Sequence, residues 1–153
     1  MNFKSRLANF IEQNGNNEDK VTITRTLNLE GNLNSPVSVK QRDHNSRLLK
    51  LSLKKDLKTN LDLTNTEVLL IVEKPDGIKE RLDGVVTNPL LGEVVFSFTK
   101  NSLSTAGTAK CEVVRIGNES STLSFPSFKI EIVESIYDDF LLGFGEDDFT
   151  VVE

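Results

Sequence analysis

The sequence predicts an all-β fold: an antiparallel β-sandwich of about eight strands, immunoglobulin-like or jelly-roll-like, preceded by a short amphipathic helix. From Lys20 onward, apolar and polar residues alternate in short runs, and Gly, Pro, Asn, Asp and Ser gather between the runs. No internal helical pattern and no repeat of about 20 to 50 residues is visible. A chain of 153 residues is long enough to bury the core of one domain without metals or disulfides.

The chain divides into three predicted segments: a helical arm at 1–19, the sandwich at 20–135, and an acidic, aromatic tail at 136–153. In the arm, one apolar stripe of a helix is formed by Phe3, Leu7, Phe10 and Ile11. Two interpretations remain open for this stripe. It either covers the domain's own core or binds a neighbouring subunit, as a helix does in a groove.

The sandwich strands are expected where the apolar pattern has a period of two. These runs are 21–30, 37–43, 47–55, 66–74, 92–100, 110–117 and 127–135. Run 66–74 is the most continuously apolar and is therefore expected in the middle of a sheet. In the long connection after 47–55, Leu57, Leu61 and Leu63 are expected to pack against the domain as part of a crossover.

The Pro75-Asp76-Gly77 sequence that follows run 66–74 predicts the tip of a β-hairpin. Proline presets φ at the first central position of a turn, and glycine accepts the positive φ needed where the chain turns back.

The tail alternates carboxylates with large apolar side chains, a composition that commonly becomes ordered against a partner. The alternative is that it wraps its own domain. Together with the stripe of the arm, the tail supplies the candidate protein-interaction residues: Phe3, Leu7, Phe10, Ile11, Phe140, Leu141, Leu142, Phe144 and Phe149.

No residue set suggests catalysis, a cofactor or a metal, so we expect a protein that is not an enzyme. Cys111 is the single cysteine, which excludes an internal disulfide and a cysteine-based zinc site, and it is expected to be a buried thiol on a strand. His44 is the single histidine and is expected in a turn without a nucleophile beside it. The carboxylate pairs 138–139 and 147–148 lie in the tail rather than on a rigid scaffold.

Charge and hydropathy limit the partners. A net charge of −5 and a pI near 5.0 argue against nucleic acid, which requires a basic face. No segment approaches the roughly 20 apolar residues of a membrane span, and the N-terminus does not resemble a signal peptide. We therefore expect a protein made in the cytoplasm without a membrane partner.

Several short motifs occur in an order that is more informative than any one of them. They are Gln41 with Asp43, Lys74–Gly77, Gly92–Phe98, Thr105 with Gly107, and Phe128–Ile132. In this order, over about residues 21–135, the chain resembles the N-terminal domain of the phage baseplate upper protein family of tailed phages of Gram-positive bacteria.

This resemblance implies a noncatalytic sandwich in the tail tip or baseplate of a virion. It implies an adaptor that attaches receptor-binding machinery to the distal tail, with the distal tail protein, the receptor-binding protein and copies of itself as partners, and hence a homo-oligomer. The alternative is a carbohydrate-binding module for host cell-wall glycans. Against it, the chain has no tryptophan and only Tyr137 as tyrosine, whereas sugar platforms favour these rings.

Overall fold

The computed structural model describes residues 20–31, 36–137 and 140–143. The predicted helix of the arm lies outside these residues. The described part contains ten strands and two short 3-10 turns, Pro89–Leu91 (η1) and Asn118–Ser120 (η2). The strands are β1 (Val21–Asn28), β2 (Val37–Lys40), β3 (Arg47–Lys54), β4 (Glu67–Glu73), β5 (Lys79–Asp83), β6 (Val85–Asn88), β7 (Glu93–Ser97), β8 (Gly107–Ile116), β9 (Thr122–Ser124) and β10 (Phe128–Val133).

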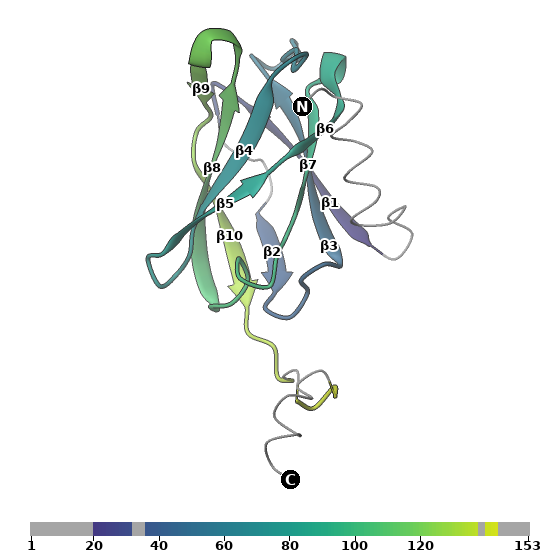
Figure 1. Ribbon diagram of the computed structural model, residues 1–153, viewed down its shortest axis with the longest axis vertical. Helices are drawn as coiled ribbons and strands as arrows, with labels where there is room; N and C mark the ends of the chain where they lie inside the picture. The colour runs from purple at the N-terminus through teal and green to yellow at the C-terminus, as the bar shows by residue number, and fades with distance from the viewer. Residues whose placement is uncertain (1–19, 32–35, 138–139, 144–153) are drawn as a thin grey trace.

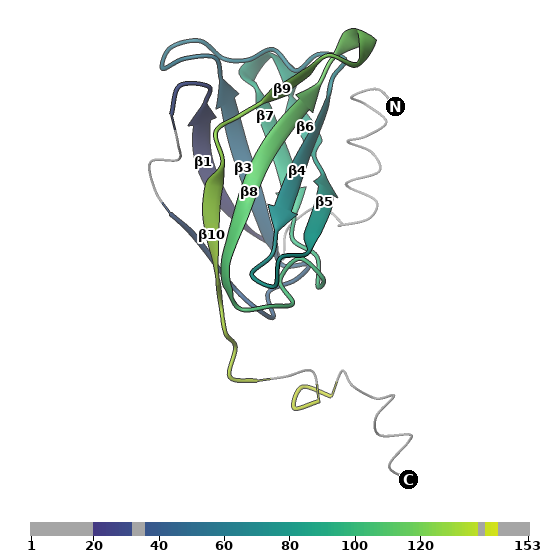
Figure 2. The same cartoon turned by 90° about the vertical axis from the view of Figure 1, so that its left-hand side faces the viewer.

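The strands form two stacked sheets, which confirms the predicted β-sandwich (Figure 1). One sheet has four strands in the order β1-β3-β7-β6. The other has six, in the order β2-β10-β8-β4-β5, with β9 paired to β8. Figure 2 shows β10, β8, β4 and β5 side by side in the second sheet. As expected from its continuous apolar run, β4 has a neighbour on each side.

The sheets are mixed, which differs from the purely antiparallel pairing that the sequence led us to expect. β1 pairs with β3 in parallel, and β2 pairs with β10 in parallel. The cause is a double crossover: the chain leaves β1, forms β2 in the opposite sheet, and returns to place β3 beside β1. Strands β5, β6 and β9 were not recognised as separate runs, because they are short and carry few apolar residues.

The core lies between the sheets and is made by the inward side chains of each strand. Alternation along β7 buries Val94 and Phe96, and the register of β3 places Leu51 and Leu49 opposite them. From the other sheet, the core receives Val68, Leu70, Val72, Ala109, Cys111, Val113, Phe128, Ile130 and Ile132. Because inward and outward residues alternate on nearly every strand, the sandwich is a closed apolar body with a polar exterior.

The connection from β3 to β4 packs against the domain in only two of the three positions that we expected. Leu61 and Leu63 are buried, whereas Leu57 is 80% exposed. The difference has a local cause. The Asp56 carboxylate accepts the amide hydrogens of Lys58 and Thr59, each at 2.8 Å, and this tight turn directs the intervening leucine outward.

The turn before β7 explains why a glycine precedes that strand. Gly92 has φ of +69° and ends η1, with its amide donating to the carbonyl of Pro89 at 3.2 Å. Its own carbonyl accepts the amide of Leu53 at 2.8 Å. A Cβ at this position would lie 2.3 Å from the carbonyl oxygen of Leu53 and 2.8 Å from that of Leu61, so only glycine fits without a shift of the backbone.

Candidate interaction surface

Three loops and the root of the tail meet at one end of the sandwich, which we call the loop end. It comprises residues 41–46 between β2 and β3, 74–78 between β4 and β5, and 98–106 between β7 and β8. The chain leaves β10 towards the tail at this end (Figure 1). The loops are joined to one another, since the Gln41 side chain donates to the carbonyl of Ser104 at 2.8 Å.

The 74–78 loop is the tip of a β-hairpin, as the sequence predicted. The Gly77 amide donates to the carbonyl of Lys74 at 2.8 Å, and Gly77 has φ of +87°. The Asp76 carboxylate accepts the Ile78 amide at 2.9 Å and the Thr105 hydroxyl at 3.2 Å. The backbone hydrogen bond from Ile78, and then the one from Thr105, lower the pKa of Asp76, because both favour the charged carboxylate.

A buried lysine attaches the 98–106 loop to this hairpin. Lys74 is only 5% exposed, and its Nζ lies 3.3 Å from Oδ1 of Asn101, 3.4 Å from the Asn101 carbonyl oxygen and 3.4 Å from Oγ of Ser104. The Glu80 carboxylate accepts from the Asn101 side-chain amide at 2.7 Å and from the Thr99 hydroxyl at 2.9 Å. Asn101 therefore bridges a cation and an anion, and the loop is held at two points.

Parts of four of the five ordered motifs meet at the loop end. Gln41, Lys74–Gly77 and Thr105 all contribute to the contacts of the loop end, and Phe98, at the end of its motif, accepts the amide of Asn45 through its carbonyl at 3.1 Å. Sequence reasoning recognised the motifs but did not foresee that Glu80 and Asn101 complete the cluster. A polar residue in a turn gives no sequence signal for the distant partner that it binds.

The root of the tail is fixed to the same end. The Val133 carbonyl accepts the amide of Gln41 at 2.8 Å, and the Ser135 hydroxyl accepts the amide of Arg42 at 3.3 Å. The next residue, Ile136, is 100% exposed. Ordered backbone therefore leads directly into a segment that displays apolar side chains.

Three of the candidate interaction residues of the tail lie in the described part of the chain, and all three are exposed. Phe140, Leu141 and Leu142 are 49%, 69% and 49% exposed. The Gly143 amide donates to the carbonyl of Phe140 at 3.0 Å, which closes a turn around them. The remaining candidates, Phe3, Leu7, Phe10, Ile11, Phe144 and Phe149, lie outside the described residues.

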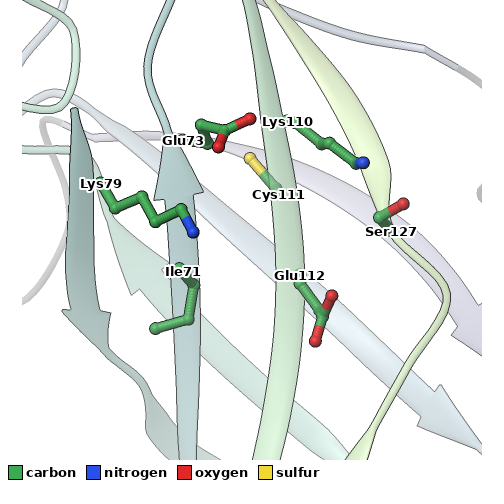
Figure 3. Close-up of a pocket in the computed structure, with 7 residues that line it drawn as sticks. All are labelled: Ile71, Glu73, Lys79, Lys110, Cys111, Glu112 and Ser127. Atoms are coloured by element: carbon green, nitrogen blue, oxygen red, sulfur yellow. The ribbon is translucent and has the colours of Figure 1, made fainter. Parts of the chain in front are cut away.

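A hollow of about 260 Å³ lies on the six-stranded sheet (Figure 3). Its lining consists of Ile71, Glu73, Lys79, Lys110, Cys111, Glu112 and Ser127. Glu73 lies in register between Lys79 and Lys110, so opposite charges alternate across the strands. No aromatic ring lines the hollow, so it lacks the stacking surface typical of carbohydrate sites.

The single cysteine lies where the sequence predicted, as a buried thiol on a strand. Cys111 is a free thiol, 1% exposed and part of the core, and burial raises its pKa to about 12, so it remains protonated at neutral pH. His44 lies in the 41–46 turn. Within residues 20–31, 36–137 and 140–143, no group of three or more His, Cys, Asp or Glu side chains could hold a metal ion. No helix in that same part of the chain is long and apolar enough to cross a membrane.

Comparison with protein families identifies the chain. A model of the BppU N-terminal domain matches residues 12–150. The chain belongs to this family. BppU is the baseplate upper protein, so the resemblance that the ordered motifs indicated is confirmed, and the chain is a structural component of a phage baseplate.

A solved structure agrees with this assignment at the level of the fold. The N-terminal domain of phage TP901-1 ORF48 superimposes with a TM-score of 0.60 at 15% sequence identity. The match covers 74% of the present BppU-family chain and 98% of the ORF48 chain. No curated protein matched the sequence.

Proposed function

We propose that this BppU-family protein is an adaptor that attaches receptor-binding machinery to the distal tail through protein–protein contacts. The sandwich supplies a rigid body and the tail, residues 136–153, supplies the attachment. Its partners would be the distal tail protein, the receptor-binding protein and further copies of the chain.

The observation that carries this proposal is the run of exposed apolar side chains that leaves a firmly held strand end. Ile136, Phe140, Leu141 and Leu142 are half to fully exposed, directly after a root that is hydrogen-bonded to the 41–46 loop. Complete burial of one such side chain contributes about 1.5–3 kcal/mol. A partner that covers all four would recover enough free energy to offset the ordering of the segment.

The architecture also favours a structural role over catalysis. The loop end is held by hydrogen bonds among Gln41, Lys74, Asn101 and Glu80, which fix the shape of the surface rather than leave reactive groups free. The one thiol points into the core. A fixed surface is what a docking module requires, because little ordering entropy is then lost when a partner binds.

The test replaces the four exposed tail residues together by serine: Ile136→Ser, Phe140→Ser, Leu141→Ser and Leu142→Ser. A matched control replaces four exposed apolar residues outside the tail and the loop end: Val21→Ser, Leu57→Ser, Leu90→Ser and Leu91→Ser. Both proteins should retain the wild-type circular dichroism spectrum, because none of the eight side chains belongs to the core.

We expect the tail variant to lose at least tenfold in affinity for the distal tail protein or the receptor-binding protein of the same phage, measured by co-elution and calorimetry. The control variant should bind as the wild type does. Wild-type binding by the tail variant, or an equal loss in the control, would contradict the proposed attachment role.

Self-association is tested with the same proteins by light scattering after gel filtration. If copies of the chain bind one another through the tail, the wild type is larger than a monomer and the tail variant is a monomer. An oligomer that survives all four tail substitutions would assign self-association to another surface.

A further inference from the structure

Side-chain nitrogen atoms that are buried without a hydrogen-bond acceptor gather at the loop end. In the part of the chain that the structure describes there are four such atoms, and three of them lie within residues 42–47. They are Nε of Arg42, Nδ1 of His44, and Nε of Arg47, which is the first residue of β3. A buried donor that has lost water without gaining an acceptor destabilises the folded chain. This cost is therefore concentrated at one place on the domain.

Cations surround the same segment. Lys20 donates to the carbonyl of Asn45, which brings its ammonium group onto the 41–46 loop. Lys40, the last residue of β2, is exposed directly before this loop. Together with Arg42 and Arg47, these two lysines form what we call the cation cluster.

The described part of the chain does not neutralise the cation cluster. Two carboxylates lie beside it in the chain: Asp43 is in the loop, and Glu134 follows the β10 residue that pairs with Lys40. No ion pair within residues 20–31, 36–137 and 140–143 joins either carboxylate to the cluster. Positive charge is therefore in excess at this place, although the whole chain has a net charge of −5.

The segment is held in shape before any partner binds. The Gln41 amide and side chain donate to the carbonyls of Val133 and Ser104, each at 2.8 Å. The Asn45 amide donates to the carbonyl of Phe98 at 3.1 Å. The buried Nε atoms show that the stems of both arginines are packed as well. Little ordering entropy is then lost when their guanidinium groups bind a ligand.

We propose that the cation cluster is a docking site for an acidic segment of another protein of the baseplate. The guanidinium groups of Arg42 and Arg47 donate to its carboxylates, a geometry that suits the planar fork of arginine. The two lysines supply further positive charge around them. The inference rests on the proposed adaptor function, because it names the chemistry of a partner surface beside the root of the tail.

The size and surroundings of the cluster favour a protein carboxylate over a phosphate polymer such as nucleic acid. A phosphate polymer is bound by many cations spread along its length. The cation cluster is confined to one loop and its flanks, and Asp43 and Glu134 lie beside it. The net charge of −5 also repels an extended polyanion at longer range.

The first test removes the charge of the two arginines and keeps their aliphatic stems: Arg42→Met together with Arg47→Met. A matched control, Lys110→Met together with Lys129→Met, removes the same charge from two exposed lysines that lie opposite each other on β8 and β10. The arginine variant should unfold at the urea midpoint of the wild type or above it, because methionine removes two buried donors. A lower midpoint would show that the arginines stabilise the fold, and it would overturn the premise of the proposal.

Binding to the distal tail protein and to the receptor-binding protein of the same phage is measured by calorimetry at low and high salt. We expect the arginine variant to lose at least about tenfold in affinity for one of them at low salt, and the control to bind as the wild type does. The wild-type affinity should fall as salt is added, and that of the arginine variant should change less.

The outcomes separate this proposal from the adaptor function. Loss of binding in the serine variant of the tail, with none in the arginine variant, would refute the docking site and leave the adaptor function standing. A wild type that bound neither protein would contradict the adaptor function itself. Binding of an oligonucleotide by the wild type, abolished in the arginine variant, would assign the cluster to a phosphate polymer instead.

A second test assumes no particular partner. Intact virions are treated with a carbodiimide, which joins an ammonium group to a carboxylate in contact with it, and the linked peptides are identified by mass spectrometry. We expect links from Lys20 or Lys40 to an Asp or Glu of another baseplate protein. Links from these lysines only to the acidic residues of this chain, or none while Lys110 and Lys129 react, would overturn the proposal.

Discussion

The turn at Gly92 allows the cost of a steric clash to be separated from the cost of a left-handed backbone. Gly92 and Gly77 both have positive φ, +69° and +87°. A Cβ at Gly77 meets nothing within 4 Å, whereas a Cβ at Gly92 meets the Leu53 carbonyl oxygen at 2.3 Å and that of Leu61 at 2.8 Å. Gly77→Ala and Gly92→Ala therefore both place an alanine in the left-handed region of backbone conformation. Only Gly92→Ala adds a steric clash with neighbouring backbone atoms.

The expected magnitudes follow. A left-handed alanine costs about 1–2 kcal/mol, and this should be the whole effect of Gly77→Ala. Gly92→Ala adds a clash with two backbone carbonyls, which costs about 1–3 kcal/mol as overpacking does. Displacement of the loop also weakens the hydrogen bond from the Leu53 amide to the Gly92 carbonyl, which contributes about 0.5–1.5 kcal/mol. The Gly92→Ala protein should be less stable than Gly77→Ala by roughly 2–4 kcal/mol.

The free energy of unfolding of both variants is measured by urea unfolding, followed by far-ultraviolet circular dichroism because the chain has no tryptophan for fluorescence. The slope of the free energy of unfolding against urea should be unchanged, which shows that the same surface becomes exposed. If the two variants lost equal stability, the close approach of the backbone at Gly92 would not be a constraint on the fold, and the argument from its geometry would be refuted.

Three further predictions concern single side chains. Leu61→Ala removes a buried side chain and should lower the free energy of unfolding by about 2–5 kcal/mol. Leu57→Ala, at the exposed turn, should lower it by less than about 0.5 kcal/mol. Both values are measured by urea unfolding, and similar losses for the two variants would contradict the assigned burial. Asp76 has a lowered pKa, so its contribution to stability is present above its unfolded value of 3.8 and is lost as the pH falls through the lower folded value. Asp76→Asn should therefore be less stable than the wild type at neutral pH, with a gap that closes in acid; a gap that does not depend on pH in urea titrations would exclude this linkage. Cys111, with a pKa of about 12, should react with a thiol reagent slowly at pH 8 in native buffer and promptly in urea; prompt reaction of the native protein would show that the thiol is accessible.

The sequence predicted which face of a strand is buried far better than which strand lies beside it. The period of two in run 47–55 indicates one buried face, and Leu49, Leu51 and Leu53 of that face are in the core; such a period reports only the direction of a side chain. It carries no information on the neighbouring strand. The parallel pairs β1–β3 and β2–β10 depend on a crossover between the sheets, which no local pattern encodes.

The surface was predictable where backbone geometry dictates residue type and not where side chains meet at a distance. Pro75-Asp76-Gly77 could be assigned as a hairpin tip because its residues satisfy known turn angles. Lys74 beside it has the composition of an exposed residue, yet it is buried against Asn101, which is 27 residues away in sequence.

The position of β10 determines how the domain would bear mechanical load. This strand is hydrogen-bonded on both sides, to β2 and to β8, and the tail continues from its end at the loop end (Figure 1). A pull on the tail acts along the strand, so the bonds on both edges are loaded together in shear instead of being peeled apart one at a time. An extension rooted in this strand can transmit tension to the whole sandwich before any single hydrogen bond yields.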